Sequence, residues 1–434
     1  MRPPSKMMIY NLFPLLAGSF TQWKVHFVKA SQMHFNWIFV NPIQQPGLSG
    51  SLYAISDQYS FNPLLLDPES RRTPEEQVRD MLEAAESLGL SVMVDLVVNH
   101  CSTDSDLIKK HPEWFLWEKG GRVSHPFTLD NGKRVVWEDL AKFDHRNTCD
   151  KEGLSQHFFK VVNYLRELGF RGFRCDAAYQ VPVNFWRRLI GEIKAKYPDC
   201  IFFAETLGCT ADQTRKTAAA GFDYIFNSSK WWDFKSPWLM EQYNLTREIA
   251  ASISFPESHD TLRLCEEFKG NIEGLKQRYL FSAYFSAGVM ITMGFEYGFR
   301  RKPHVVTTRP GDWEKTDIDL TSFIEKVNRI KETYTIFQEE APAEILHGNN
   351  PQVVTMWKAS THTDEESLLI LNKDMYNKQS FFAESLQEFV QARAPLIDVS
   401  PEYPLDFIPT PFSYDLRPGQ GIILITKRSP VREG

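Results

Sequence analysis

Short apolar segments alternate with amphipathic segments along the first 340 residues of the chain, and this alternation limits the possible folds more than any other feature. The clearest amphipathic segment, residues 74–88, has apolar side chains at helical spacing, an N-cap at Thr73 and Pro74 at the first helical position. An almost entirely apolar segment, residues 92–98, follows it, as expected for a strand buried on both faces. The alternation therefore predicts a parallel β-sheet covered by helices.

We predict eight strand–helix pairs and an α/β fold of the (β/α)8 TIM barrel class. The expected strands are residues 8–13, 37–40, 92–98, 172–176, 201–205, 222–226, 253–256 and 289–295. The expected helices are residues 23–33, 74–88, 154–168, 184–197, 211–220, 239–250, 272–287 and 320–334. An open doubly wound sheet is the alternative, but the sequence has no glycine-rich phosphate loop after the first strand.

Two parts of the chain depart from the alternation. Residues 101–151 are polar, aromatic and irregular, which predicts an excursion between the third strand and the next helix. After residue 340, short apolar runs are separated by Pro, Asn and Gly turns, which predicts a C-terminal all-β sandwich domain. The expected organisation is a catalytic barrel of residues 1–100 and 152–340, the excursion, and a sandwich of residues 341–434.

Composition excludes some partners and leaves others open. A net charge of -6 and a pI near 6.0 do not favour nucleic acid, and no apolar run reaches the ~18 residues of a membrane span. The six cysteines are scattered without metal-like spacing, which predicts free thiols and a cytoplasmic protein. Residues 7–16 resemble a weak signal peptide, but Pro14 interrupts the run and the barrel needs it as a first strand, so we expect it to be retained. The oligomeric state is not predictable.

Charged and polar side chains gather at the ends of four expected strands. Those side chains are Asp95, Asn99 and His100 after the third strand, Arg174 and Asp176 at the fourth, Glu205 at the fifth, and His259 and Asp260 after the seventh. Because a barrel keeps its chemistry at the carboxyl ends of its strands, we expect them to meet there. Alternate strand positions share a face, so Arg174 and Asp176 point together and Cys175 points away.

Several carboxylates on one buried rim are electrostatically costly, and such clusters are more often functional than structural. The set suits retaining glycoside chemistry, in which one carboxylate attacks the anomeric carbon and a carboxylic acid protonates the leaving oxygen. A nearby Arg favours the charged form of the nucleophile. A metal-dependent hydrolase is the alternative barrel enzyme, but only His100 and His259 lie at strand ends.

The motifs DLVVNH, GFRCDAA, FFAET and PESHD, in this order, resemble the four sequence regions of the α-amylase family of retaining α-glycosidases. The resemblance implies that Asp176 is the nucleophile, Glu205 the general acid/base, and Asp260 a group that binds ring hydroxyls. It also implies a stacking role for Tyr53 in GSLYAISDQY. The remaining implied assignments are substrate binding for His100, Arg174 and His259, and a structural role at the rim for Asp95 and Asn99.

The resemblance implies no metal ligand in the site and no required cofactor, although a structural calcium is an option in the excursion. Its candidate ligands are Asp104, Asp106, Asp130, Asp139 and Asp144, but their spacing matches no calcium loop, which favours a solvated acidic surface. At the position after the nucleophile's strand, where calcium-dependent amylases often have Lys-His, this chain has Gln180.

The expected function is an α-amylase-type hydrolase that acts on α-1,4 bonds of an α-glucan or malto-oligosaccharide. A transglycosylase that uses a sugar acceptor is the alternative, because HPEWF at residues 111–115 resembles the maltosyl-transferring and trehalose-forming branches. The branch that uses maltose-1-phosphate replaces the His of its HD pair, whereas this chain keeps His259. A non-catalytic sugar-binding barrel is disfavoured because all three carboxylates are present.

Tryptophans are candidates for an acceptor platform, since aromatic faces stack on sugar rings. The candidates are Trp114, Trp117 and Trp137 in the excursion, and Trp231, Trp232 and Trp238 after the sixth strand. Packing in the core is the alternative for each of them. Trp232 is expected to favour transfer over hydrolysis if it belongs to such a platform.

Overall fold

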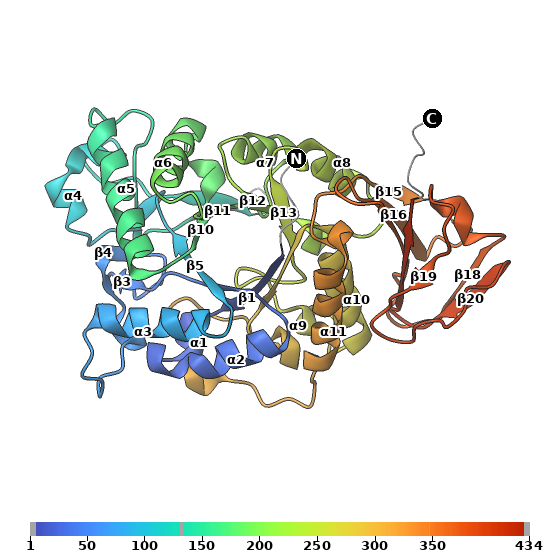
Figure 1. The fold of residues 1–434 in the computed structure, drawn as a ribbon. Coiled ribbons are helices and arrows are strands. Elements are labelled where there is room, and N and C mark those ends of the chain that lie inside the picture. The colour runs from blue at the N-terminus through green and yellow to red at the C-terminus, as the bar shows by residue number, and fades with distance from the viewer. Residues whose placement is uncertain (1–5, 131–132, 347, 429–434) are drawn as a thin grey trace.

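The computed structural model describes residues 6–130, 133–346 and 348–428 of the chain. Its central unit is a closed barrel of eight parallel strands, which confirms the predicted fold class (Figure 1). Around the barrel the strands follow the order β1 (Met7–Leu12), β14 (Gly288–Thr292), β13 (Ala251–Ser254), β12 (Tyr224–Phe226), β11 (Ile201–Glu205), β10 (Gly172–Cys175), β5 (Ser91–Leu96) and β2 (Trp37–Val40).

Helices cover the outside of the barrel. They are α1 (Pro14–Ala17), α2 (Lys24–Gln32), α3 (Pro74–Glu86), α5 (Lys151–Leu168), α6 (Val183–Lys196), α7 (Ala211–Ala218), α8 (Trp238–Thr246), α9 (Leu264–Glu267), α10 (Ile272–Phe285) and α11 (Thr321–Thr333). Helix α3 begins with the expected cap, because the backbone N–H of Glu76 donates to the Thr73 hydroxyl and the Glu76 carboxylate accepts from the Thr73 backbone. No helix in the described part of the chain is long and apolar enough to cross a membrane.

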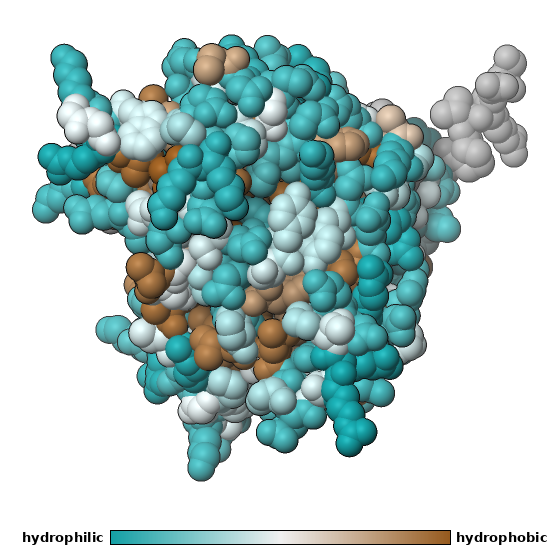
Figure 2. Space-filling view, turned by 90° about the vertical axis from the view of Figure 1, so that its left-hand side faces the viewer, coloured by the Kyte–Doolittle hydropathy of each residue, from teal (hydrophilic) through white to brown (hydrophobic). Residues whose placement is uncertain are grey.

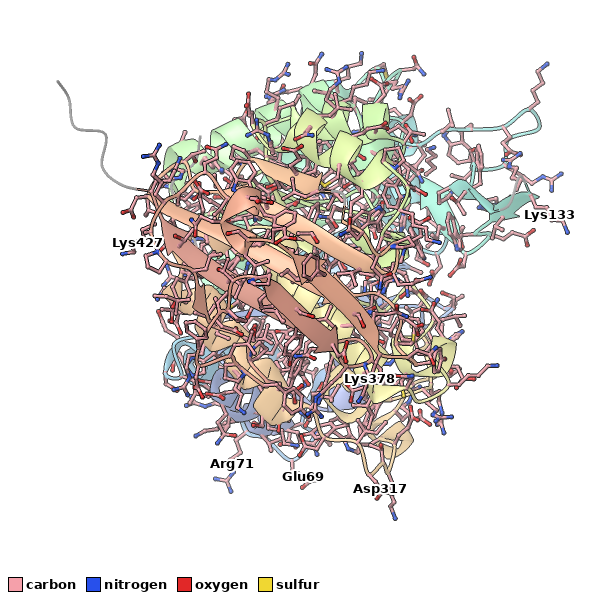
Figure 3. All side chains as sticks on the ribbon, turned by 90° about the vertical axis from the view of Figure 1, so that its right-hand side faces the viewer. Glu69, Arg71, Lys133, Asp317, Lys378 and Lys427 are labelled. Carbon is pink, nitrogen blue, oxygen red and sulfur yellow. The ribbon has the colours of Figure 1, made fainter. Side chains whose placement is uncertain are left out.

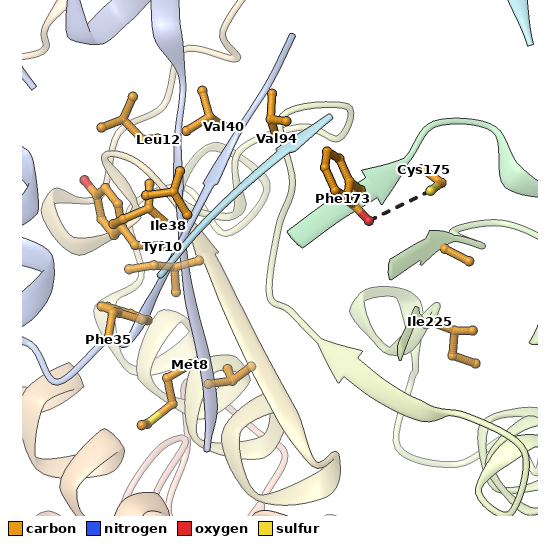
Figure 4. Close-up of a cluster of buried hydrophobic side chains, with 14 of the residues drawn as sticks. Met8, Tyr10, Leu12, Phe35, Ile38, Val40, Val94, Phe173, Cys175 and Ile225 are labelled. Atoms are coloured by element: carbon orange, nitrogen blue, oxygen red, sulfur yellow. Dashed lines mark hydrogen bonds between the residues drawn. The ribbon is translucent and has the colours of Figure 1, made fainter. Parts of the chain in front are cut away.

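The strands separate two apolar layers, because successive side chains point to opposite faces. Met8, Tyr10 and Leu12 of β1 lie in the layer between strands and helices, together with Phe173 and Cys175 of β10 (Figure 4). The inner layer, which fills the barrel, contains Met7, Ile9, Phe39, Met93, Phe203 and Phe226. The prediction that Cys175 faces away from the site is confirmed.

The residues between β5 and α5 form the expected excursion. Its short strands β6 (His100–Ser102) and β9 (Leu140–Lys142) pair with each other, and α4 (Leu107–Lys110) lies between them in sequence. A hairpin of β7 (Phe127–Asp130) and β8 (Lys133–Val136) projects from the molecule, with Lys133 far from the barrel (Figure 3). The face of the molecule on the α3 and α4 side is mostly hydrophilic, with small separate hydrophobic patches (Figure 2).

A second small sheet was not predicted. Strands β3 (Gln44–Pro46) and β4 (Ile55–Phe61) pair after β2, and the loop between them carries Tyr53. The segments are polar and short, and β-bulges interrupt their pairing, so they lack the alternation that marks a strand.

The C-terminal part consists of antiparallel sheets beside α10 and α11 (Figures 1 and 3). One has the order β15 (Ala343–Leu346), β16 (Val353–Ala359), β17 (Glu365–Asn372), β21 (Gly421–Lys427) and β19 (Ile397–Asp398), and the other pairs β18 (Gln379–Ala383) with β20 (Phe412–Leu416). The buried Lys358 Nζ donates to the carbonyls of Tyr284 and Phe285 at the end of α10, at 3.2 and 2.9 Å. This contact lies at the amino end of β14, so the C-terminal sheets leave the opposite end of the barrel free.

Several element boundaries differ from the prediction at the carboxyl ends of the strands. The eighth strand stops at Thr292, because the chain turns at Gly294 with φ +91° into a short 3-10 turn. The third and fourth strands stop at Leu96 and Cys175, and α5 begins at Lys151, three residues before the predicted start. Apolar residues continue past the third and eighth strands because the rim is buried there as well.

Candidate active site

Arg174 occupies the centre of the carboxyl end of the barrel. Its Nη1 donates to Asp95 Oδ1 at 2.9 Å and to Asp176 Oδ1 at 3.0 Å. Its Nη2 lies 3.1 Å from Glu205 Oε1. The Arg174 side chain is only 5% exposed, so one guanidinium faces three carboxylates where water screens charge poorly. The carboxylates outnumber the cation, and the site is therefore electrostatically suited to hold a proton.

Adjacent strands explain how these side chains meet. Arg174 on β10 is in register with Asp95 on β5 and with Phe203 on β11, two residues before Glu205. After Asp176 the chain turns sharply, because Ala177 has left-handed dihedral angles of φ 44° and ψ 39°. This turn points the Ala177 backbone N–H at Glu205 Oε2, at 2.7 Å. A strained non-glycine residue between the two carboxylates is common at functional sites.

Burial raises the pKa of Asp176 well above its usual range, and the nearby Glu205 carboxylate raises it further, while Arg174 opposes both effects. Burial likewise raises the pKa of Asp95, which Arg174 and His259 partly offset. The Asp176 shift means that the site binds a proton more readily than an exposed carboxylate would. Asp176 and Glu205 also contact the same guanidinium.

Tyr53, His259 and Asp260 form the second part of the site. The Tyr53 hydroxyl donates to Asp95 Oδ2 at 2.8 Å and lies 2.8 Å from His259 Nε2. The Tyr53 and His259 rings are nearly parallel, with centroids 5.9 Å apart and planes inclined by 10°. His259 Nε2 also lies 3.0 Å from Asp260 Oδ2. These contacts join the loop after β2 to the end of β13.

Asp260 is the most accessible carboxylate of the set, with a side chain that is 49% exposed at the mouth of the site. Partial burial would raise the pKa of Asp260, but His259 and Arg174 outweigh it and hold the pKa far below its usual range. Lys302 donates to the Asp260 backbone carbonyl at 2.6 Å, and its charge acts in the same direction. Asp260 is therefore an anion that a sugar hydroxyl can reach.

His100 and Asn99 lie at the edge of the site. Burial lowers the pKa of His100 to about 4, so the ring is neutral at pH 7, and its Nε2 has no hydrogen-bond partner among the described residues. The Asn99 side chain donates to Gln180 Oε1 at 3.3 Å, and so joins the excursion to the turn after Asp176. The structure thus brings Asp95, Arg174, Asp176, Glu205, Tyr53, His259 and Asp260 together, with Asn99 and His100 beside them.

Sequence reasoning missed Asn41 and Asn11. The Asn41 side chain donates to the Tyr53 hydroxyl at 2.9 Å, and the Asn11 side chain donates to Asn41 Oδ1 at 3.0 Å. Both are buried and fix the Tyr53 hydroxyl between Asn41 and Asp95. Asn41 directly follows β2, so the rule that identified the other residues, a polar side chain at a strand end, also applies to it.

The tryptophan predictions separate into two groups. Trp232 is 2% exposed and packs against Phe234 and Phe281, so its proposed place in an acceptor platform is wrong. Trp114 is also buried, at 4%. Trp117, Trp137 and Trp231 are exposed by more than a third, and Trp238 is half-buried. Sequence alone did not separate the groups, because neighbouring tryptophans carry the same chemical signal.

Two of the candidate calcium ligands in the excursion, Asp104 and Asp144, accept hydrogen bonds from backbone N–H groups. Asp104 accepts from the backbone of Leu48 at 3.2 Å, and Asp144 accepts from the backbone of Arg146 and Asn147 at 3.2 and 2.9 Å. The side chain of Asp130 lies outside the described part of the structure. Among the described residues, no group of three or more His, Cys, Asp or Glu side chains is arranged to hold a metal ion.

Comparison with known proteins agrees with this geometry. Residues 3–118 match the family described as "Glycogen debranching enzyme, glucanotransferase domain". The chain is 23% identical over 398 residues to an α-1,4-glucan:maltose-1-phosphate maltosyltransferase of Burkholderia pseudomallei, which covers 86% of this chain and 34% of that protein. It is 26% identical over 281 residues to the enzyme of the same name from Arcanobacterium haemolyticum, covering 64% of this chain and 38% of that protein. The chain is thus similar in sequence to enzymes that act on α-glucans.

Solved structures show the same fold over almost the entire chain. A maltogenic α-amylase from Thermotoga neapolitana matches with a TM-score of 0.78 and 20% identity, over 98% of this chain and 99% of that one. An α-amylase from Geobacillus thermoleovorans matches with a TM-score of 0.79 and 14% identity, over 99% and 100%. In contrast, the chain spans only about a third to a half of the length of the maltosyltransferases it resembles. The shared fold therefore extends over barrel, excursion and C-terminal sheets, whereas the activity of the longer relatives does not transfer directly.

Proposed function

We propose that this protein cleaves α-glucosidic bonds of an α-glucan or malto-oligosaccharide with retention of configuration. The contact of Arg174 with both Asp176 and Glu205 carries the proposal, because it places a nucleophile and an acid/base on one guanidinium. In retaining enzymes these two carboxyl groups are about 5 Å apart, which leaves no space for a water molecule between nucleophile and sugar.

In the proposed reaction Asp176 attacks the anomeric carbon and Glu205 gives its proton to the leaving oxygen. Arg174 stabilises the Asp176 carboxylate that performs the attack. Glu205 Oε2 accepts a hydrogen bond from the Ala177 N–H, and Glu205 Oε1 forms an ion pair with Arg174. The substrate oxygen therefore has to replace one of these contacts. The second step returns the sugar to an incoming hydroxyl, which Glu205 deprotonates.

The donor sugar would lie between Tyr53 and Asp260. The Tyr53 ring supplies an apolar face, while Asp260 and His259 supply acceptors and donors for ring hydroxyls. The contact of His259 with both Tyr53 and Asp260 supports this placement, because it fixes all three side chains in the absence of a sugar. Pre-organised groups lose less conformational freedom when the substrate binds.

Water is the acceptor in our main proposal, which makes the protein an α-amylase-type hydrolase. Transfer to a sugar acceptor is the second candidate, and the maltosyltransferase names of the similar proteins support it. A purely sugar-binding role is less well supported, since Asp176, Glu205 and Asp260 would then form a costly cluster without use.

Proton NMR of the first product tests the proposal. With maltotetraose as substrate, we expect the new reducing end to form as the α-anomer, before mutarotation, because two inversions at one carbon restore its configuration. A β-anomer as the first product would contradict the covalent Asp176 intermediate. An absence of cleavage of maltotriose, maltotetraose and starch, with and without added maltose, would contradict the function itself.

The proposed reaction needs no cofactor, because the two carboxyl groups perform both proton transfer and nucleophilic attack. We expect activity on maltotetraose to remain within about twofold after treatment with EDTA and desalting. A structural calcium bound in the excursion would lower the melting temperature and the activity together when it is removed. Loss of activity at an unchanged melting temperature would contradict a metal-free mechanism.

Location and other partners are part of the same proposal. A cytoplasmic location is supported by the cysteines, since the described structure contains six free thiols and four of them are buried. A net charge of -6 argues against nucleic acid as a partner. The proposed partner is an α-glucan.

A further inference from the structure

The loop between β13 and α9 carries His259 and Asp260 at the mouth of the barrel. The Asp260 side chain is 49% exposed and Leu262 is 60% exposed, so solvent covers much of the outer side of this loop. Surface loops are more mobile than the elements they connect. Because Asp260 is proposed to meet a sugar at a defined position, the loop needs buried contacts that fix it.

A buried ion pair joins the two ends of this loop. Glu257 precedes His259 and Asp260 in the chain, Arg263 follows them, and Arg263 Nη1 lies 2.8 Å from Glu257 Oε1. Both side chains are only 1% exposed. The second carboxylate oxygen, Glu257 Oε2, accepts from the backbone N–H of Leu264 at 2.6 Å, where α9 begins. One carboxylate therefore holds a side chain and a backbone group at the far end of the loop.

Hydrogen bonds inside the loop fix the backbone of Asp260. The Ser258 N–H donates to the Thr261 hydroxyl at 3.0 Å, and the Thr261 N–H donates to the Ser258 carbonyl at 3.2 Å. The Asp260 N–H donates to the Ser258 hydroxyl at 3.2 Å. The position of Asp260 therefore depends on how the ends of the loop are held, and the ion pair of Glu257 and Arg263 holds them.

Arg263 also binds the turn that follows β14. Its Nη2 donates to the Met293 carbonyl at 2.8 Å. Gly294 leaves space for the guanidinium, because a Cβ atom at that position would be 2.6 Å from Arg263 Nη2. The same segment continues to Lys302, which donates to the Asp260 backbone carbonyl at 2.6 Å. Arg263 therefore connects the two segments that meet at Asp260.

Net stability is a weak explanation for this ion pair. Burial removes two charges from water, and a well-packed apolar pair of similar volume often stabilises a fold equally well. The ion pair adds direction, because charge-assisted contacts have a defined geometry whereas apolar contacts are non-directional. A buried pair at the ends of a loop that presents a partly exposed carboxylate therefore points to a role in the geometry of that carboxylate.

We propose that Glu257 and Arg263 are positioning residues, whose ion pair holds the loop closed and so keeps Asp260 where a bound sugar meets it. The inference rests on the proposed function, and it adds two buried residues that act on the reaction through Asp260. Asp260 is expected to contribute mainly in the transition state, when the sugar ring is distorted. A misplaced Asp260 should therefore lower kcat more than it changes KM.

A double variant tests this role without leaving a buried charge unpaired. Glu257→Gln with Arg263→Met removes both charges and keeps an acceptor for the Leu264 N–H, so the melting temperature should stay close to that of the wild type. We expect kcat on maltotetraose to fall about 10²-fold, because a small misplacement of a group in the site costs that much. The matched control is Lys276→Met with Glu402→Leu, which removes an ion pair of the same 2.8 Å separation between α10 and the C-terminal part. The kcat of this control should equal that of the wild type.

Combination with Asp260→Asn separates positioning from general damage to the fold. If the ion pair acts through Asp260, its removal costs little more once Asp260 is replaced, so the two effects on kcat are not additive as free energies. Additive effects, or an unchanged kcat in the folded double variant, would overturn the inference. If the double variant does not fold, Glu257→Asp takes its place in the same cycle, because it keeps both charges and shortens the acid by one methylene group.

Hydrogen–deuterium exchange measures the loop without any activity. The backbone amides of residues 257–264 should exchange about tenfold faster in the double variant than in the wild type, because the loop opens more often. The control variant should leave their exchange unchanged. If the wild type cleaves no α-glucoside, the proposed function fails, and this measurement alone decides whether the ion pair holds the loop. Equal exchange in the double variant and the wild type would overturn the inference in either case.

Discussion

Asp176→Asn should abolish turnover of every α-glucoside, whereas Glu205→Gln should lose only substrates with poor leaving groups. The nucleophile is needed in all cases, and loss of a positioned acid/base costs about 10²–10⁴ in rate. A glycosyl fluoride leaves without protonation, so Glu205→Gln should still form the covalent intermediate from maltosyl fluoride. The measurement is the rate of fluoride release compared with the rate of maltotetraose cleavage.

The two variants serve as controls for each other, because Asp176 and Glu205 contact the same Arg174 guanidinium and differ only in their proposed roles. Accumulation of a protein adduct of maltosyl mass in Glu205→Gln, seen by mass spectrometry and absent in Asp176→Asn, would support both roles. Near-normal turnover of maltotetraose by Asp176→Asn would show that the nucleophile is wrongly assigned. If Glu205→Gln lost activity on maltosyl fluoride and on maltotetraose equally, Glu205 would not be the acid.

Arg174→Met should lower the free energy of unfolding by about 3–5 kcal/mol at pH 7, and it should also abolish activity. Removing one partner of a buried ion pair leaves uncompensated charge, and here Asp95, Asp176 and Glu205 all lose the same cation. Urea denaturation of the wild type and the variant measures the difference. Arg171→Met is a matched control, because Arg171 is 42% exposed and pairs with Glu86 and Asp199 at the surface. Arg171→Met should lower the free energy of unfolding by less than about 1 kcal/mol.

The pH dependence distinguishes this explanation from a packing defect. Asp176 already has a pKa raised by burial, and loss of Arg174 raises it further above the value in the unfolded chain. A folded state that binds more protons than the unfolded state becomes less stable as pH rises. The stability difference between variant and wild type therefore grows above the pKa of Asp176 in the wild type, until the higher pKa of Asp176 in the variant is passed. The difference between variant and wild type should therefore shrink when the pH is lowered from 7 to 5. A difference that is the same at both pH values would indicate lost packing.

The alternation of apolar and amphipathic segments was sufficient to predict the barrel and the excursion. Helical spacing and strand burial are local properties, and residues 74–88 and 92–98 show both without reference to the rest of the chain. Because parallel strands in a barrel all end at one rim, the strand-end positions of Asp176, Glu205 and Asp260 also placed them together. The distance between two of these groups depends on register, which sequence does not encode locally.

The hydrogen bonds and ion pairs of the site depend on the tertiary structure. Arg174 contacts three carboxylates only because β5, β10 and β11 are neighbours, and Asn41 reaches the Tyr53 hydroxyl only because the loop after β2 folds back over the rim. Trp231 and Trp232 are adjacent and chemically identical, yet one is 52% exposed and the other 2%. Which ring faces solvent follows from the direction of the backbone in a turn, and that direction is set by distant partners such as Glu267.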